Sequence, residues 1–328
     1  MPVALTSGQA PAVWDVHAAP LSAVASLPVG AAVEPELLIL DESYRRTVVR
    51  EFNAVTPENV MKWGLIHPFP HYWTFDPADR LVDFAVTHRM RIHGHTLIWH
   101  KQLPTWLTLE LTQRQVRHAL ASHIETLVGR YAGRIASWDV VNEAIADGGR
   151  RLRDTYFLRS CGADYIAQAF RWAHGADPAA RLYYNDYGAE GAGRKADAVY
   201  MLVRNLLDAG VPIHGVGLQM HLRANRPTAP ADIAVNMSRL RALGLEVRIS
   251  EMDVAIRHVH AGEPLAVQRT VYHDTLAACV GQPGLTGVTL WGVGDAHTWI
   301  RQDAPLLFDQ TYEPKPAYFG ARDAFAGR

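Results

Sequence analysis

The sequence of 328 residues contains only two cysteines, Cys161 and Cys279, and no apolar run long enough to cross a membrane. Two thiols in a chain of this length do not make a disulfide framework, so we expect both to be small buried hydrophobic residues. A membrane-spanning helix needs about 20 predominantly apolar residues, and we therefore predict no membrane partner.

The sequence also lacks an excess of either charge. Lys and Arg number 32, Asp and Glu number 33, and the formal net charge is −1. Nucleic acids and anionic membranes attract basic surfaces, so we predict neither as a partner. No Lys or Arg precedes Arg45, and no secretory signal is recognisable. We expect a protein that acts inside the cell if Met1 is its native start, and a secreted one if a signal peptide was removed.

Eight short apolar segments, each typical of a buried strand, recur along the chain. They cover residues 27–33, 51–56, 91–99, 137–143, 181–186, 215–220, 246–253 and 284–291. Helical patterns lie between them, such as 77–90, 112–131 and 195–210, and the second and third of these have apolar residues at three-to-four spacing. Eight strand–helix units in about 300 residues predict a single (β/α)₈ TIM barrel. No glycine-rich loop follows the first segment, which disfavours a dinucleotide site.

No repeat, linker or low-complexity segment divides the chain. We therefore predict one catalytic barrel domain over residues 1–328, in which residues 1–26 form an extension that packs before the first strand. We expect this domain to be a monomer.

Side chains suited to a functional site occur at the carboxyl ends of the predicted strands, where a barrel builds its active site. They are Glu58, Asn59 and Lys62 after the second strand, His95, Trp99 and His100 after the third, Asn142 and Glu143 after the fourth, Asn185 and Asp186 after the fifth, Gln219 and His221 after the sixth, Glu251 and Asp253 after the seventh, and Trp291 after the eighth, with Trp299 in the loop beyond. One such residue could be a satisfied structural group, but seven strand ends together predict a site.

The alternation of side chains in a strand places some of these residues on shared faces. Gln219 should share a face with His221, and Glu251 with Asp253. Asn142 and Glu143 are adjacent, so both can face the site only if the strand ends or bulges there.

The composition of this site suits a neutral, polyhydroxylated ligand. Aromatic faces stack on the apolar faces of sugar rings, and amides and carboxylates pair with hydroxyl groups. Two glutamates on opposed strands also match glycoside hydrolysis, which needs one carboxyl group to protonate the leaving oxygen and another to attack or to activate water.

A metal site is the competing interpretation. His93 and His95 have the His-x-His spacing of some barrel metallohydrolases, and His100 is near. That ligand set would need further His and Asp residues at other strand ends, which His221 alone does not supply. We predict no metal and no cofactor.

Seven segments of the sequence resemble glycoside hydrolase family 10, the barrel endo-xylanases. They read TPENVMKW (56–63), HGHTLIWHKQLPTW (93–106), WDVVNEA (138–144), YYNDY (183–187), GVGLQMH (215–221), ISEMD (249–253) and TLWGVGDAHTW (289–299). The resemblance extends from residue 30 to the end of the chain. It implies a retaining endo-1,4-β-xylanase that hydrolyses xylan or xylo-oligosaccharides through a covalent glycosyl-enzyme intermediate.

The resemblance also implies a role for each matching position. Glu143 would be the acid/base and Glu251 the nucleophile. Asn142 would bond the 2-hydroxyl of the sugar being cleaved, while His221 and Asp253 would orient the nucleophile and keep it ionised. The substrate would be bound by Glu58, Asn59, Lys62, His95, Trp99 and Gln102 in the glycone subsites, and by Gln219, Trp291 and Trp299 around the sugar being cleaved.

Three parts of the sequence depart from the family pattern. Met252 stands where Leu is more usual, Ala296 and His297 replace a frequent Lys and aromatic residue, and the segment 146–154 is short. These departures leave the subsite affinities open. Two alternatives therefore remain: an exo-acting or oligosaccharide-preferring β-glycosidase on the same scaffold, and a non-catalytic glycan-binding barrel, which the presence of both glutamates disfavours.

Overall fold

Eight parallel strands close into a barrel in the computed structural model, which describes residues 19–108, 111–260 and 262–328. They are β1 (Val29–Val33), β2 (Ala54–Pro57), β3 (Arg91–Gly94), β4 (Ser137–Asn142), β5 (Arg181–Asp186), β6 (Gly215–Leu218), β8 (Glu246–Ala255) and β9 (Leu285–Leu290). The ring closes through the pairings of β6 with β8 and of β9 with β1. A short extra strand, β7 (His221–Arg223), pairs with β8. The predicted (β/α)₈ barrel is confirmed.

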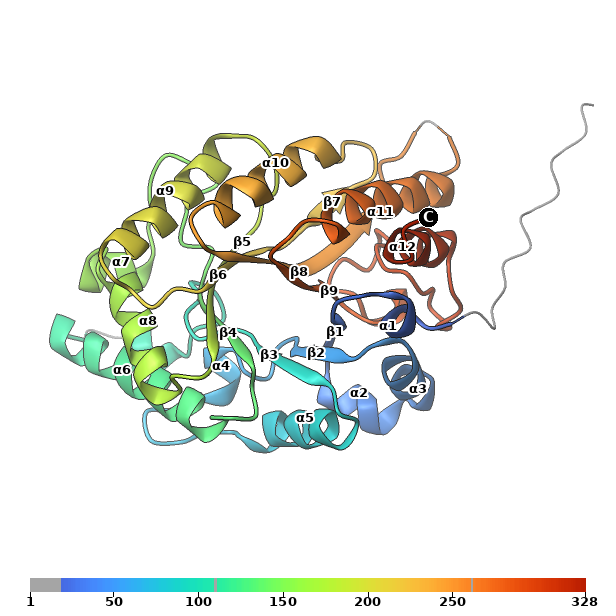
Figure 1. The fold of residues 1–328 in the computed structure, drawn as a ribbon. Helices are drawn as coiled ribbons and strands as arrows, with labels where there is room; N and C mark the ends of the chain where they lie inside the picture. Colours follow the sequence, from blue (N-terminus) through green and yellow to red (C-terminus); the bar gives the residue numbers. More distant parts are fainter. Residues whose placement is uncertain (1–18, 109–110, 261) are drawn as a thin grey trace, which may run out of the picture.

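Helices surround the ring of strands, as Figure 1 shows. They are α1 (Leu21–Val24), α2 (Pro35–Leu40), α3 (Glu42–Glu51), α4 (Trp63–Ile66), α5 (Asp76–Thr87), α6 (Gln113–Arg130), α7 (Tyr156–Cys161), α8 (Tyr165–Ala176), α9 (Arg194–Asp208), α10 (Pro230–Arg241), α11 (Pro264–Val280) and α12 (Pro316–Phe325), with two short 3₁₀ helices at Thr105–Thr108 and Asp295–His297. The helices predicted at 77–90, 112–131 and 195–210 correspond to α5, α6 and α9.

Local sequence sets the ends of these helices. Thr112 caps α6, because its side chain accepts from the backbone N–H of Gln115 while the Gln115 side chain accepts from the backbone of Thr112. Gly210 follows α9 with a φ of 62°, a conformation that favours glycine. Pro230 opens α10 in the first turn, where its missing N–H costs nothing.

Two predicted strands end earlier than expected. The third stops at Gly94 instead of residue 99, because the chain then runs beside β4 with irregular pairing, as in the bridge between Ile98 and Val141. The sixth stops at Leu218, because Met220 has a φ of 61° and cannot continue a strand. His221 therefore lies on the separate strand β7. The prediction that Gln219 and His221 share the face of one strand is wrong.

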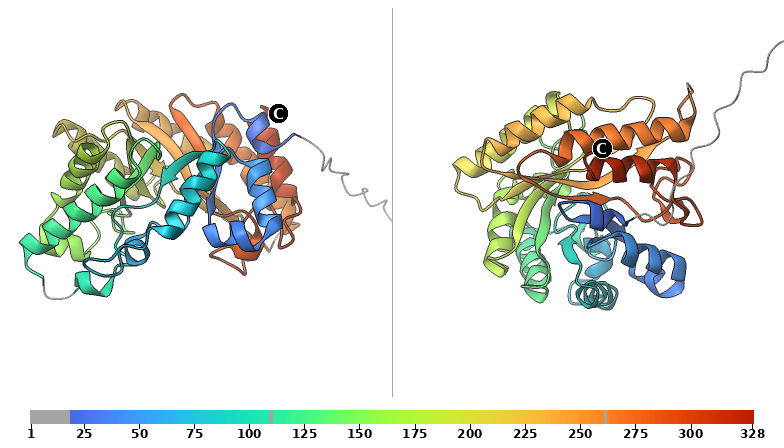
Figure 2. Two further views of the ribbon diagram at one scale, coloured as in Figure 1. Left: turned by 90° about the horizontal axis from the view of Figure 1, so that it is seen from below. Right: turned by 45° about the vertical axis from the view of Figure 1, so that its right-hand side comes forward.

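The two ends of the described chain meet at one side of the barrel. Helix α1 lies beside α12 in Figures 1 and 2. Leu21 is buried there, and its backbone N–H donates to the Glu51 carboxylate at 3.0 Å. Residues 1–18 of the predicted extension lie outside the described residues. Cys161 and Cys279 are both buried and free, as expected. Among the described helices, none combines the length and apolar content needed to cross a lipid bilayer.

Candidate active site

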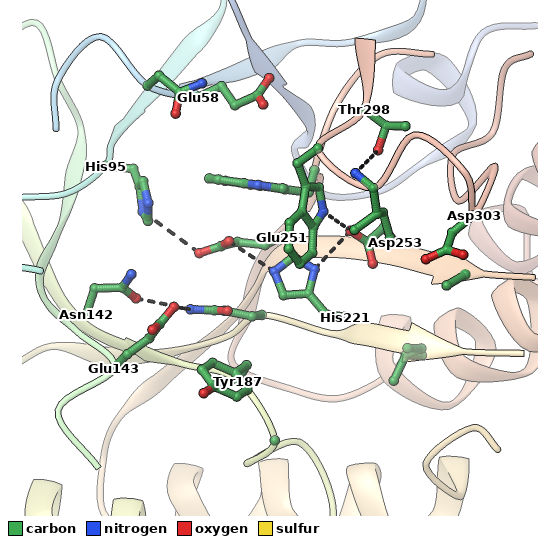
Figure 3. A pocket seen from close by; sticks show the side chains of 18 of the residues that line it. Glu58, His95, Asn142, Glu143, Tyr187, His221, Glu251, Asp253, Thr298 and Asp303 are labelled. Carbon is green, nitrogen blue, oxygen red and sulfur yellow. Dashed lines mark hydrogen bonds and ion pairs between the residues drawn. The ribbon is translucent and has the colours of Figure 1, made fainter. Parts of the chain in front are cut away.

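The loops at the carboxyl ends of the strands surround a cleft of about 1330 Å³. All fourteen residues to which the resemblance gave a role line this cleft: Glu58, Asn59, Lys62, His95, Trp99, Gln102, Asn142, Glu143, Gln219, His221, Glu251, Asp253, Trp291 and Trp299. The other strand-end candidates, His100, Asn185 and Asp186, are not among its lining residues. Figure 3 shows both glutamates among the side chains that line it, and Glu143 directly follows β4 whereas Glu251 lies on β8. The position of these residues at strand ends therefore brings them together, as a barrel does.

Glu143 stands at the point where β4 ends. Its φ of 58° turns the chain sharply after Asn142, so both side chains reach the cleft, as the sequence required. Two bonds hold this unusual backbone: the Glu143 N–H donates to the Asn185 carbonyl at 2.8 Å, and the Arg153 guanidinium donates to the Glu143 carbonyl at 3.0 Å. Strain of this kind persists where the surrounding structure imposes it.

The Glu143 carboxyl group has few protein partners. One oxygen accepts from the Gln219 side chain at 3.4 Å. The other has no hydrogen-bond partner among the described residues, and the His100 imidazole is 3.9 Å away. A carboxyl group that is buried yet lightly bonded is suited to exchanging a proton with a ligand.

Glu251 is bonded much more strongly. One carboxylate oxygen accepts from the Asn185 amide at 2.6 Å, and the other lies 3.3 Å from His221 Nε2. His221 Nδ1 contacts Asp253 at 2.9 Å, and the Trp299 indole donates to the same Asp253 oxygen at 2.8 Å. The imidazole thus lies between two carboxylates (Figure 3).

The charges of this group support one another. Burial alone would raise the pKa of Glu251, but the hydrogen bond from His221 and the nearby His95 outweigh it and lower that pKa. Burial would lower the pKa of His221, but Asp253 and Glu251 outweigh it and raise that pKa well above its usual value. His221 is therefore a cation at neutral pH, and it keeps Glu251 ionised.

His93 and His95 share one carboxylate, that of Asp139. His93 Nε2 lies 3.0 Å from one oxygen and His95 Nδ1 lies 2.9 Å from the other. Burial would raise the pKa of Asp139, but the two imidazoles outweigh it and lower that pKa. Asp139 is buried beneath the cleft and orients His95 toward it.

The geometry does not favour the His-x-His metal interpretation. His95, Asp139 and Glu251 have ligand atoms within 4.8 Å of one another, which is close enough to hold an ion. However, His93 lines a different cavity from His95, so the two imidazoles do not converge on one point. His95 is already hydrogen-bonded to Asp139 through Nδ1, and His93 Nε2 lies against the other oxygen of the same carboxylate.

The loop after β2 supplies a charged wall of the cleft. The Lys62 ammonium lies 5.0 Å from the centre of the Trp99 ring and donates to the Asn59 side chain at 3.0 Å. The Asn59 amide donates in turn to Glu34. Burial, and then the charge of Glu34, raise the pKa of Glu58 to about 8, so Glu58 is protonated at neutral pH. Burial lowers the pKa of Lys62.

Sequence reasoning missed Asp139 and Glu34 as parts of the site, and it placed Asn185 at a strand end without giving it a role. The Asn185 amide donates both to Glu251 and to the Asn142 side-chain oxygen, the latter at 3.0 Å. That oxygen also accepts from Gln219 at 3.1 Å. Asn142 therefore has its oxygen occupied by protein, and its NH₂ group is left to donate into the cleft. The position of Asn185 at the end of a predicted strand was the feature of the sequence that placed it near the site.

Comparison with known proteins gives consistent matches over nearly the whole chain. The model of the family described as "Glycosyl hydrolase family 10" matches residues 19–324. A "Beta-1,4-xylanase" of Dictyoglomus thermophilum is 40% identical over 294 residues, which are 84% of this chain and 83% of that protein. The native crystal structure of xylanase 10B from Thermotoga maritima is 37% identical with a TM-score of 0.89, covering 93% of this chain and 98% of that one. Xylanase 10B from Thermotoga petrophila RKU-1, in complex with xylobiose, is 37% identical with a TM-score of 0.88, covering 93% and 95%.

Proposed function

Because the chain belongs to glycosyl hydrolase family 10, we propose that it is a retaining endo-1,4-β-xylanase with Glu143 as acid/base and Glu251 as nucleophile. The observation that carries the assignment is the contrast between the two carboxyl groups. Glu251 is ionised beside a cationic His221, whereas Glu143 has one oxygen without a protein partner among the described residues. Two carboxyl groups in such different surroundings suit two different roles.

In the first step, an oxygen of Glu251 attacks the anomeric carbon while the bond from that carbon to the leaving oxygen breaks. Glu143 gives its proton to the leaving oxygen, and the sugar remains bound to Glu251 as an ester. The free NH₂ group of Asn142 is placed to donate to the 2-hydroxyl of that sugar. The cationic His221 stabilises the charge of Glu251 before attack.

In the second step, Glu143 acts as base. It removes a proton from water, whose oxygen attacks the anomeric carbon and displaces Glu251. Two inversions leave the configuration unchanged. This mechanism requires the two carboxyl groups to lie about 5–5.5 Å apart in the substrate complex, whereas an inverting enzyme needs roughly 6.5–9.5 Å.

The substrate proposed is xylan or a xylo-oligosaccharide. Support comes from the xylanase relatives and from the neighbour that binds xylobiose. The cleft walls suit sugars, since Trp99, Trp291 and Trp299 offer aromatic faces and several amides offer hydrogen bonds. The glycone subsites would be formed by Glu58, Asn59, Lys62, His95, Trp99 and Gln102, and Gln219, Trp291 and Trp299 would enclose the sugar being cleaved.

The decisive experiment compares viscosity with reducing ends during digestion of xylan, cellulose and short xylo-oligomers. An endo-acting xylanase should lower the viscosity of xylan before much reducing sugar appears, with little action on cellulose. Reducing sugar that appears without loss of viscosity would identify an exo-acting or oligosaccharide-preferring enzyme. The Glu251→Gln variant serves as the control, because it should bind xylan without hydrolysing it. If the wild type also binds xylan without hydrolysing it, the protein is a glycan-binding barrel.

A further inference from the structure

A second cavity, of about 150 Å³, lies at the opposite end of the barrel from the cleft. It is lined mainly by residues on six strands, at or near their amino-terminal ends, among them Arg91 on β3, Arg181 on β5, and Glu246 and Arg248 on β8. One water-sized probe needs roughly 10–15 Å³, so this cavity has room for an ion with some of its hydration.

The guanidinium of Arg248 is buried in this cavity without a carboxylate partner. Arg248 as a whole is only 7% exposed. One terminal nitrogen donates to Thr289 Oγ1 at 2.6 Å, but Nε has no hydrogen-bond partner among the described residues. Burial is the main cause that lowers the pKa of Arg248, and Arg91 acts in the same direction. A guanidinium does not deprotonate in proteins, so its positive charge must be balanced by another group or by an ion from solution.

No carboxylate among the described residues forms a direct ion pair with Arg248, although the charge of Asp139 acts to raise its pKa. The Glu246 carboxylate lies 2.7 Å from Arg181 and also accepts from the Tyr183 hydroxyl at 2.5 Å. Asp139 is held between two imidazoles above the cavity. The cavity is therefore lined by three guanidinium groups and one carboxylate. A buried charge that lacks a direct ion pair opposes folding.

We propose that this cavity binds one small inorganic anion, such as chloride or phosphate, which accepts from the Arg248 guanidinium and neutralises its charge. The anion is separated from the cleft by the length of the barrel. Residues at this end of a barrel serve stability, whereas those at the other end serve catalysis. The site would therefore raise stability and leave the choice of substrate unchanged.

The test measures Tm in sodium chloride, sodium phosphate and sodium gluconate at one pH and one sodium concentration. Gluconate is too bulky for the cavity and serves as the reference. In the wild type, Tm should rise with the logarithm of the concentration of the bound anion, by roughly 2–5 °C at ten times the dissociation constant. A rise in chloride identifies a halide-sized site, and a rise in phosphate alone identifies an oxyanion site.

Variants separate binding from general salt effects. Arg248→Met should lose the anion-dependent rise, whereas Arg171→Met, which changes an exposed arginine on α8, should keep it. Phosphate also stabilises proteins by exclusion, and that part should remain in Arg248→Met. If Arg248→Met does not fold, Arg91→Gln at the exposed mouth should reduce the slope of Tm against anion concentration. Equal slopes in gluconate and in both other salts, or slopes that neither variant changes, would overturn the proposal.

Discussion

Replacing Asn185 by alanine should reduce the rate of xylan hydrolysis much more than it reduces the affinity for the substrate. Asn185 is fully buried, and its amide donates to Glu251 at 2.6 Å. Its orientation is determined by its partners, because a carboxylate only accepts and the Ser250 hydroxyl donates to the Asn185 oxygen at 2.6 Å. Asn185 thus fixes the position of the proposed nucleophile although it does not line the cleft.

The size of the effect follows from the kind of hydrogen bond that is lost. A bond to a charged acceptor contributes about 1.5–3 kcal/mol, and each 1.4 kcal/mol is a factor of ten in rate. We therefore expect kcat/KM to fall by roughly 10- to 150-fold in Asn185→Ala, mostly through kcat. Ser250→Ala removes only the neutral bond that orients the amide, about 0.5–1.5 kcal/mol, and should cost less than about tenfold.

The assay uses two aryl xylobiosides, one whose leaving group needs protonation and one whose leaving group does not. A misplaced nucleophile slows attack on both, whereas a misplaced acid slows only the first. Asn185→Ala should therefore lose a similar factor on both substrates, with Tm measured beside it to detect unfolding. A loss confined to the poor leaving group, or a loss below about threefold on both, would refute this role.

Four further predictions concern the cleft. In Glu143→Ala, azide should restore turnover of an activated aryl xylobioside and give the β-glycosyl azide, whereas in Glu251→Ala it should give the α-product; the opposite stereochemistry, seen by NMR, would reverse the two roles. His221→Asn removes the hydrogen bond that most lowers the pKa of Glu251, so the acid limb of kcat/KM should move to higher pH, and an unmoved limb in the pH profile would exclude this role. As pH rises through about 8, Glu58 ionises and adds a negative charge to the cleft, so KM should rise in the wild type but stay level in Glu58→Gln. Trp299→Ala should narrow the preference for xylobiosides over matched cellobiosides by roughly tenfold, because the bulky ring no longer crowds a hydroxymethyl group; an unchanged ratio of kcat/KM would show that selectivity arises elsewhere.

The fold could be predicted because buried parallel strands have nearly continuous apolar sequences. Strand β1, for example, is buried at all five positions, and its residues pair on both sides. The strand ends were harder to predict, since they depend on backbone conformation. Nothing in the residue type of Met220 indicates a positive φ, yet that conformation ends β6 and starts β7.

The membership of the site was predictable, but its internal bonding was not. A barrel brings every strand end to one cleft, so a polar residue at a strand end is placed there by topology alone. The bond from Asn185 to Glu251 joins residues 66 apart, and the one from His95 to Asp139 joins residues 44 apart. Such contacts depend on register and on side-chain direction, which periodicity does not specify.

Polar and charged side chains follow one another along the interior of this barrel. Glu251 faces the cleft, with His95 3.9 Å away, and Asp139 lies between the two imidazoles. Burial is the largest cause that lowers the pKa of His93; Asp139 opposes it, and the charge of Arg248 lowers that pKa further. Barrel interiors are usually filled by layers of Val, Ile and Leu, so these positions replace apolar packing with polar contacts. Removing one member would leave its neighbours buried and unpaired, which costs far more than the pair contributes. The same chain of pairs that keeps Glu251 ionised at the cleft thus ends, at the other end of the barrel, on a guanidinium that has no carboxylate partner among the described residues, and this is the place where an anion from solution would complete the pattern.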